Sequence, residues 1–279
     1  MTTLLVLLGL LAPPLSADLD GREIAPQARP RIVSLSPAQT ETLYAIGAGG
    51  DLVAASDYCN HPPAARKLPK VGALTNLSVE KVVAHRPTLL VAASGSREQW
   101  KHLQKVTGAP VFVATDGGIA AVRSDLRALG RICKREAAAA ALERRIDTKL
   151  REVRAASAGK PRPRVFYLVW DDPLMSAGKG SYLDDLIREA GGRNVTGDRS
   201  EPYPRLSWET LLAAPPDVIV GPSNLRSVVA AAARKTGARR WAVLDQGVAS
   251  RPGPRVIEAL DLFHGAIHGK TAAPAKTHP

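Results

Sequence analysis

Aromatic residues are scarce in this chain: Phe, Trp and Tyr together make up 4% of its 279 residues. The chain is strongly basic, with a formal net charge of +12, but its basic and acidic residues are mixed, as in the segment ERRID at 143–147. Surfaces that bind nucleic acid usually gather basic residues beside stacking rings. The composition therefore favours a solvated surface of mixed charge, and no nucleic-acid partner is expected.

Cysteine is nearly absent, since the chain has only Cys59 and Cys133. Two cysteines are too few for a disulfide-rich scaffold or a cysteine-based metal site. In an oxidising compartment they could form one disulfide, which would contribute about 4 kcal/mol by closing a long loop. Two separate thiols are the alternative, because the sequence does not show that the two residues meet. His264 and His268 are four residues apart, and we expect surface positions for them rather than a zinc site.

An apolar run of membrane-spanning length is also missing. The first residues, MTTLLVLLGLLAPPLSA, have the layout of a secretory signal peptide over 1–17, with Leu15 and Ala17 at the cleavage-determining positions. The run is shorter than the roughly 20 residues of a membrane span. We therefore expect export, and no lipid anchor, because no cysteine lies near the cleavage region. An uncleaved anchor or a wrongly assigned start codon is the alternative.

Short apolar runs alternate with helical patterns along most of the chain. Runs at 31–35, 52–55, 89–92 and 111–113 come before the middle of the chain, and runs at 164–169, 217–220 and 241–244 come after it. Such alternation predicts an α/β fold with mainly parallel sheets. Between the two groups, strong helix formers at helical spacing predict one long helix, which GKPRP at 159–163 ends. The predicted organisation is an N-terminal lobe at 28–135, a bridging helix at 136–158, a C-terminal lobe at 159–269 and a disordered tail at 270–279.

One fifteen-residue pattern occurs twice. Residues 77–91 read LSVEKVVAHRPTLLV, and residues 206–220 read LSWETLLAAPPDVIV. In each copy a serine, Ser78 or Ser207, can cap a helix, and a glutamate two residues later lies in the first turn. A proline then ends the helix before an apolar strand. The repeat predicts two similar lobes.

Motifs of enzymatic chemistry are missing. The sequence has no nucleophile elbow, HExxH or Walker A pattern. The loop GKGS at 178–181 favours a helix cap by Ser181, with Asp184 completing a capping box. The segment WDDP at 170–173 follows a strand, where it could form a ligand rim or a simple turn. A hydrolase using Asp171 or Asp172 is an alternative, but no partner base or nucleophile is identifiable, so we expect a protein without enzymatic activity.

Several segments together resemble the periplasmic cobalamin-binding proteins of ABC importers. More widely, they resemble the substrate-binding proteins with a helical backbone that capture cobalamin, ferric siderophores or haem. The resemblance runs from about residue 31 to 268, and it is carried by RIVSLSPAQTETLYAIGAG, SDYCNHPPAARKLPKVG, both copies of the repeat, DPLMSAGKGSYLDDLIREAGGRNV and SRPGPRVIEAL.

The resemblance implies a periplasmic, monomeric protein of two α/β lobes that holds a small metal-chelate ligand between them. It implies a membrane permease as partner, on whose arginines Glu80 and Glu209 would dock. The ligand it implies is a cobalt corrinoid, with no resident cofactor or metal, and a ferric siderophore is the alternative. Haem is disfavoured, because the tyrosine that haem binders place near Ala73 is missing. Leu74 and Ala93 also replace aromatic residues of the cobalamin binders.

Tyr58 matches a corrin-contacting tyrosine of that family, Tyr203 a cleft tryptophan and Arg251 a cleft arginine, and Met175 and Trp170 lie in the matching loop of the second lobe. His61, beside Tyr58, could reach a corrin cobalt, and a neutral loop histidine is the alternative. The implied ligand-binding residues are Tyr58, His61, Trp170, Asp171, Met175, Tyr203 and Arg251.

Overall fold

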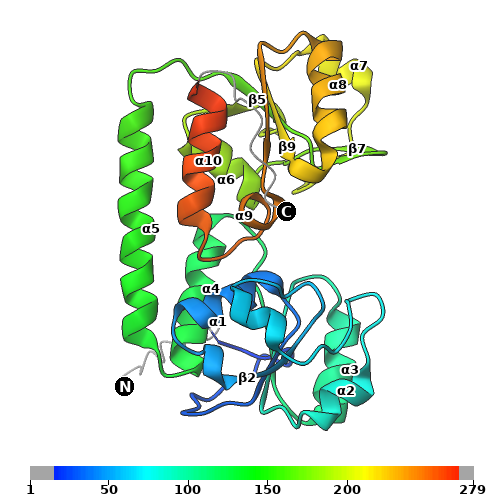
Figure 1. The fold of residues 1–279 in the computed structure, drawn as a ribbon, viewed down its shortest axis with the longest axis vertical. Helices are drawn as coiled ribbons and strands as arrows, with labels where there is room; N and C mark the ends of the chain where they lie inside the picture. Colours follow the sequence, from blue (N-terminus) through cyan, green and yellow to red (C-terminus); the bar gives the residue numbers. More distant parts are fainter. Residues whose placement is uncertain (1–15, 270–279) are drawn as a thin grey trace, which may run out of the picture.

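A computed structural model describes residues 16–269 of the chain as two α/β lobes connected by one long helix (Figure 1). This helix, α5, spans Glu136–Ser157 and runs along one side of the molecule, on the left in Figure 1. The lobe before α5 and the lobe after it each contain a four-stranded parallel sheet. The predicted fold class is therefore confirmed.

The sheet of the first lobe has the strand order β2-β1-β3-β4. Its strands are β1 (Ile32–Ser34), β2 (Leu52–Ala55), β3 (Leu89–Ala92) and β4 (Val111–Val113). The helices of this lobe are α1 (Pro37–Ala45), α2 (Val79–Ala84), α3 (Arg97–Thr107) and α4 (Ile119–Ile132). The strands are buried along nearly their whole length, which is typical of parallel sheets covered by helices.

The sheet of the second lobe has the order β10-β9-β5-β8. Its strands are β5 (Arg164–Tyr167), β8 (Arg193–Asn194), β9 (Val218–Pro222) and β10 (Arg240–Leu244). A small antiparallel hairpin is formed by β6 (Trp170–Asp171) and β7 (Leu174–Met175). The helices are α6 (Tyr182–Glu189), α7 (Trp208–Ala213), α8 (Arg226–Thr236), α9 (Gln246–Ala249) and α10 (Val256–His268).

The two sheets have the same topology. From its opposite edge the second sheet has the order β8-β5-β9-β10, which matches β2-β1-β3-β4 strand for strand in chain order. The two copies of the repeat form α2 with β3 and α7 with β9, at equivalent places in the two lobes. Ser78 and Ser207 cap these helices, each accepting a hydrogen bond from the backbone N–H three residues later at 3.2 Å. The predicted duplication and both caps are confirmed.

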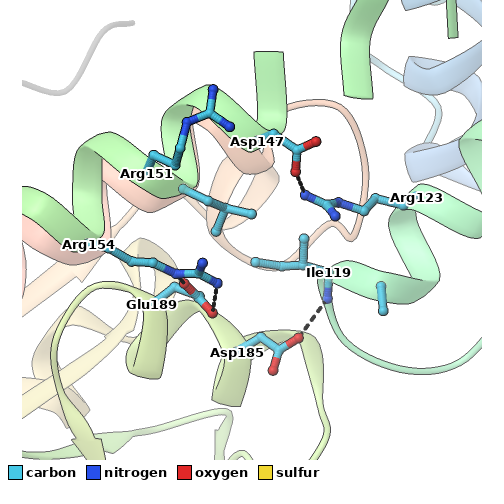
Figure 2. A pocket seen from close by; sticks show the side chains of 9 residues that line it. Ile119, Arg123, Asp147, Arg151, Arg154, Asp185 and Glu189 are labelled. Carbon is cyan, nitrogen blue, oxygen red and sulfur yellow. Dashed lines mark hydrogen bonds and ion pairs between the residues drawn. The ribbon is translucent and has the colours of Figure 1, made fainter. Parts of the chain in front are cut away.

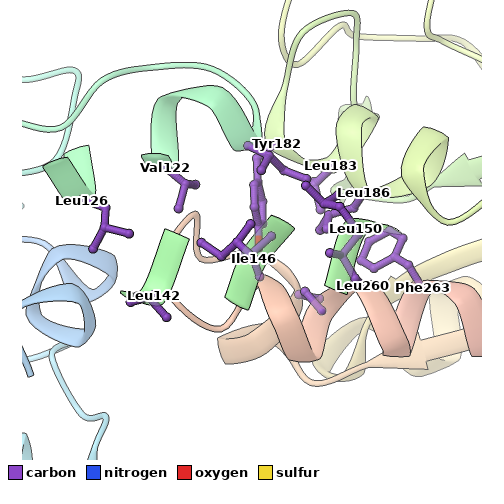
Figure 3. Close-up of a cluster of buried hydrophobic side chains, with 14 of the residues drawn as sticks. Val122, Leu126, Leu142, Ile146, Leu150, Tyr182, Leu183, Leu186, Leu260 and Phe263 are labelled. Atoms are coloured by element: carbon purple, nitrogen blue, oxygen red, sulfur yellow. The ribbon is translucent and has the colours of Figure 1, made fainter. Parts of the chain in front are cut away.

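Helix α5 is packed against both lobes by an apolar stripe. Leu142, Ile146, Leu150 and Val153 recur at helical spacing and are buried. Figure 3 shows Leu142, Ile146 and Leu150 of this stripe among side chains of α4, α6 and α10. One core cluster includes this stripe and residues of both sheets. The bridge is therefore part of a continuous core, which stiffens the connection between the lobes.

The predicted signal peptide lies largely outside the described residues, as does the predicted tail at 270–279. At its end, Ala17 forms an antiparallel bridge with Glu23, and the Ser16 carbonyl accepts a hydrogen bond from the Ile24 N–H at 2.7 Å. Within residues 16–269, no helix is both long and apolar enough to cross a membrane.

The two cysteines are separate, buried thiols, so the disulfide considered from the sequence is not formed. They lie near opposite ends of β2, an edge strand of the first sheet. The Cys59 Sγ is 3.1 Å from the Ser56 Oγ, just after β2, whereas Cys133 ends α4 in the electrostatic field of Asp51, just before β2. Burial raises the pKa of Cys133 to about 12, which makes it an unreactive core thiol.

Candidate ligand-binding cleft

A cavity of about 630 Å³ lies between the two lobes. The first lobe contributes α4 and the loops that follow β1, β3 and β4, and the second contributes the loop before α6 and the loops around residues 203 and 251. Ligands of open α/β sheets bind at the carboxyl ends of the strands, where these first-lobe loops lie. The volume is within the range of about 300–1,000 Å³ found for small-molecule sites.

The first-lobe wall contains a buried polar pair. The Gln39 Nε2 donates to the Asp125 Oδ2 at 2.8 Å, and the Thr115 N–H donates to the Asp125 Oδ1 at 3.0 Å. Both Gln39 and Asp125 line the cavity while being almost fully buried. Burial raises the pKa of Asp125 to about 6, although its two hydrogen-bond donors act in the opposite direction. This carboxyl group therefore changes its charge in mildly acidic solution.

A second buried cluster joins the lobes beside the cavity. The Glu41 carboxylate, on α1 of the first lobe, is 3% exposed and accepts hydrogen bonds from two arginines of the second lobe. Arg255 binds it through two nitrogens, each at 2.7 Å, and the Arg251 Nη1 binds it at 2.8 Å. Two-nitrogen arginine–carboxylate contacts combine strength with fixed geometry. We call Glu41, Arg251 and Arg255 the interlobe cluster.

Arg251 was predicted from the sequence as a ligand-binding residue, and it does line the cavity. Its guanidinium also donates to the Asn60 Oδ1 at 2.9 Å and to the Tyr58 carbonyl at 3.3 Å. The guanidinium therefore makes three interlobe contacts, two of them with the loop after β2. Residues of the first lobe therefore hold this second-lobe side chain in its position at the cavity.

Sequence reasoning missed Glu41, Gln39 and Asp125. A signal was present for Glu41, because it lies in a helix whose apolar neighbours are buried, and a buried charge requires a partner. The identity of that partner was not readable from the sequence, since Arg255 lies more than 200 residues away.

The predicted aromatic residues lie at or near the cavity. Tyr203 is half exposed and lines the cavity directly. Tyr58 is 61% exposed and lies outside the lining residues, although its backbone carbonyl binds Arg251. His61 follows Tyr58 in the same loop and is partly buried. Two residues stand where the cobalamin binders have aromatic side chains. Of these, Ala93 lines the cavity, while Leu74 packs on the core of the first lobe.

The segment 170–175 forms the β6–β7 hairpin, with Asp172 and Pro173 at its turn. Trp170 pairs with Met175 across this hairpin, and Asp171 pairs with Leu174. Trp170 is half exposed, and its indole N–H donates to the Asp172 carbonyl at 2.9 Å. None of these residues is among the lining residues of the cavity. Of the two interpretations of this segment, the structure shows the turn, formed by the hairpin.

The glycine-rich loop at 178–181 reaches the cavity through Gly180 and Ser181. The Ser181 Oγ accepts a hydrogen bond from the Asp184 N–H at 3.2 Å, so the predicted helix cap is present. The reciprocal bond differs from the prediction: the Asp184 carboxylate accepts from the Gly180 N–H at 3.2 Å rather than from the cap residue. The loop is thus held by its cap and presents backbone to the cavity.

His264 and His268 are partly buried rather than on the open surface. The His264 Nδ1 lies 3.1 Å from the Ser157 Oγ, and the His268 Nε2 lies 3.0 Å from the Ala190 carbonyl oxygen. Both rings therefore help to pack α10 against α5 and the end of α6.

A separate hollow of about 310 Å³ lies between α4, α5 and α6 (Figure 2). Ion pairs surround it, Arg123 with Asp147 and Arg154 with Glu189, and Asp185 of the second lobe accepts from the Ile119 N–H at 2.8 Å. Because ion pairs and a hydrogen bond across this hollow join α4, α5 and α6, we interpret it as part of the connection between the lobes.

The two glutamates of the repeat are exposed in the first turns of α2 and α7. Hydrogen bonds from their own backbone N–H groups, followed by those of Ser78 and Ser207, lower the pKa of both carboxyl groups. Glu80 and Glu209 therefore present two negative charges at equivalent places on the two lobes.

Comparison with known sequences identifies relatives over most of the chain. Residues 32–259 match the family described as periplasmic binding protein. The vitamin B12-binding protein of Salmonella typhimurium is 32% identical over 195 residues, which are 69% of this chain and 72% of the relative. The vitamin B12-binding protein of Yersinia pestis is 30% identical over 196 residues, which are 70% of each chain.

Comparison with solved structures gives the same fold. The periplasmic vitamin B12 binding protein BtuF of Vibrio cholerae has a TM-score of 0.74 at 24% identity, covering 86% of this chain and 97% of its own. The periplasmic heme-binding protein BhuT, solved with two hemes, also has a TM-score of 0.74, at 28% identity, covering 85% of this chain and 97% of its own.

Proposed function

Because this chain belongs to the periplasmic binding protein family, we propose that it captures a cobalamin-type corrinoid between its lobes and delivers it to an ABC import permease. The observation that carries the proposal is the cavity between the lobes, in a chain that is 32% identical to a vitamin B12-binding protein. Capture in this cleft needs no covalent chemistry, and the corrinoid is cargo rather than a resident cofactor.

The ligand contacts follow from the cleft. Tyr203 offers a half-exposed ring inside the cavity. Tyr58 and Trp170 have exposed rings outside the cavity, and we propose that these two rings pack on the part of a corrin that extends beyond the cavity. We propose Met175 and Asp171 as further contacts from the hairpin, and His61 as a group near the cobalt. Arg251 would contact the ligand while it remains bound to Glu41.

Titration of the purified chain with cobalamin and with cobinamide tests the ligand. We expect saturable binding at micromolar concentration or tighter, together with a higher melting temperature, because a ligand selective for the folded state stabilises it. The Tyr203→Ala variant should bind at least about tenfold more weakly, as expected for an aromatic anchor, and Leu262→Ala is the control at a distant surface position. If neither corrinoid binds while hemin or a ferric siderophore does, the cargo proposed here is wrong and the binding role remains.

The permease contacts are proposed for Glu80 and Glu209. Exposed ion pairs contribute little affinity, but two of them at a fixed separation define the orientation of a partner. A Glu80→Ala/Glu209→Ala double variant should bind ligand normally and fail to support uptake by cells that lack the natural chain. Normal uptake would remove the docking role from the two glutamates.

We also propose that residues 1–17 direct export and are removed, and that the mature chain is a monomer. Sequencing of the amino terminus of protein from a periplasmic extract would test cleavage, which should follow Ala17. Light scattering of the same sample should give the mass of one chain, and a mass of two chains would contradict the second statement.

A further inference from the structure

Few large apolar side chains are strongly exposed among the described residues. They are Tyr58, Val83, Val106, Trp170, Tyr203, Leu212 and Leu262. The three aromatic residues belong to the proposed ligand contacts. Val83 and Leu212 are the members that lie on α2 and α7, the two helices that carry the exposed glutamates.

Val83 and Leu212 occupy the same position in the two copies of the repeat. Each comes three residues after the glutamate of its copy, and residues three apart lie on one face of a helix. Their exposed fractions are nearly equal, 41% for Val83 and 42% for Leu212. A single exposed aliphatic residue needs no explanation. The same exposed position in both lobes indicates a shared role.

Packing of the two helices does not require these side chains. The preceding residues, Val82 and Leu211, are buried and hold α2 and α7 on their own lobe cores. On each helix the apolar residue directly after this buried one is exposed to solvent. The outward residue stands beside a carboxylate whose lowered pKa keeps it charged.

We propose that Val83 and Leu212 complete two equivalent docking patches, each made of one apolar side chain beside one carboxylate. The proposal rests on the permease-docking function above. The occupant it names is the permease, which would present the same site twice, a basic side chain next to an apolar recess, as a pair of identical subunits does. Both helices lie on the side of the molecule opposite α5, so one partner can contact both patches (Figure 1).

The two parts of each patch have different tasks. The ion pair steers the encounter and sets orientation. Burial of the adjacent apolar side chain removes water from around the ion pair, which strengthens an interaction that is weak when solvated. A carboxylate alone on each lobe would give orientation with little affinity.

The test uses the Val83→Asn/Leu212→Asn double variant and the permease of the same organism reconstituted in nanodiscs. We expect at least about a tenfold loss of affinity for the permease, as for an apolar contact central to an interface. Affinity for cobalamin should be unchanged. The matched control is Val106→Asn/Leu262→Asn, because Val106 and Leu262 are 42% and 36% exposed on the helices α3 and α10. This control should bind the permease normally.

The outcomes separate this inference from the function on which it rests. Normal permease affinity in Val83→Asn/Leu212→Asn, with loss in Glu80→Ala/Glu209→Ala, would overturn the apolar contacts and leave the docking function intact. Equal loss in the Val106→Asn/Leu262→Asn control would also overturn them, since the effect would then be general. If the unsubstituted chain does not bind the permease, both the docking function and the patches are wrong.

Discussion

The carboxyl group of Asp125 lies in the wall of the cleft, where burial raises its pKa to about 6 from an ordinary value of 3.8. Its hydrogen bonds from Gln39 and Thr115 do not fully replace the water that it has lost. Gln39 in turn has a buried Oε1 with no hydrogen-bond partner among the described residues. Ionisation of Asp125 therefore lowers the stability of the folded chain relative to its state with a protonated Asp125.

This cost predicts a pH dependence that the Asp125→Asn variant should lack. The folded chain binds the proton of Asp125 more tightly than the unfolded chain does. The contribution of this group to the free energy of unfolding therefore falls as the pH rises from about 4 to about 6, by about 3 kcal/mol, and is constant above that range. Asparagine would stay neutral, and its amide could donate to the Gln39 Oε1.

Urea unfolding of both proteins between pH 4 and pH 7 would measure this difference. The wild-type chain should lose stability relative to the variant across that range. Parallel pH profiles for the two proteins would show that Asp125 is not the titrating group.

At the scale of the element, α4 depends on the other lobe for its beginning. Gly118, its N-cap residue, has no side chain to cap the helix, and Asp185 of α6 accepts from the Ile119 N–H instead. A Cβ at position 118 would lie 1.9 Å from an oxygen of Asp185. Glycine is therefore required here by space rather than by backbone conformation.

The Gly118→Ala variant should lose about 1–2 kcal/mol of stability, because it displaces the carboxylate that caps α4. The Gly265→Ala variant is a matched control, since a Cβ at this exposed helical position meets nothing within 4 Å. It should gain about 0.5–1 kcal/mol from the helix propensity of alanine. Thermal unfolding would measure both changes, and a stabilising effect of Gly118→Ala would contradict the assigned role of Asp185.

The whole molecule is a pair of lobes held by a shared core and by the interlobe cluster. Helix α5 and its apolar stripe connect the lobes on one side (Figure 3). Glu41, with Arg251 and Arg255, connects them beside the cavity. With contacts on both sides, the angle between the lobes is set by packed residues, and we expect it to change little when a ligand binds.

The Glu41→Gln variant tests the second connection. Removal of one partner from a buried ion pair costs about 3–5 kcal/mol, because it leaves the other charges uncompensated. The variant should also bind cobalamin more weakly, since Arg251 would lose its main anchor. Glu23→Gln is the control, because Glu23 pairs with Arg131 at the exposed surface, where such pairs contribute less than about 1 kcal/mol. Small-angle scattering would detect a changed lobe arrangement, and equal effects of the two variants would contradict the connecting role of Glu41.

Local patterns in the sequence predicted most of the fold. Strands at 52–55, 89–92 and 111–113 were predicted at their observed positions, and the long helix from 136 ends at Ser157, just before GKPRP. The caps at Ser78 and Ser207 were also readable. The physical reason is that strand burial, helix periodicity and capping involve residues close together in the chain. The repeat extended this local information to the whole architecture, since two similar segments predicted two similar lobes.

Only the tertiary structure decided which distant residues meet. It separated Cys59 from Cys133, which the sequence allowed to pair, because the two lie near opposite ends of β2. It joined Arg251 to Glu41, 210 residues away, and so gave a predicted ligand residue a second role. It also exposed Val83 and Leu212 while burying Val82 and Leu211. The helices α2 and α7 have six residues each, which is too few for the sequence pattern to predict which face is buried. Contacts between lobes depend on how two finished surfaces fit, and that information is not local.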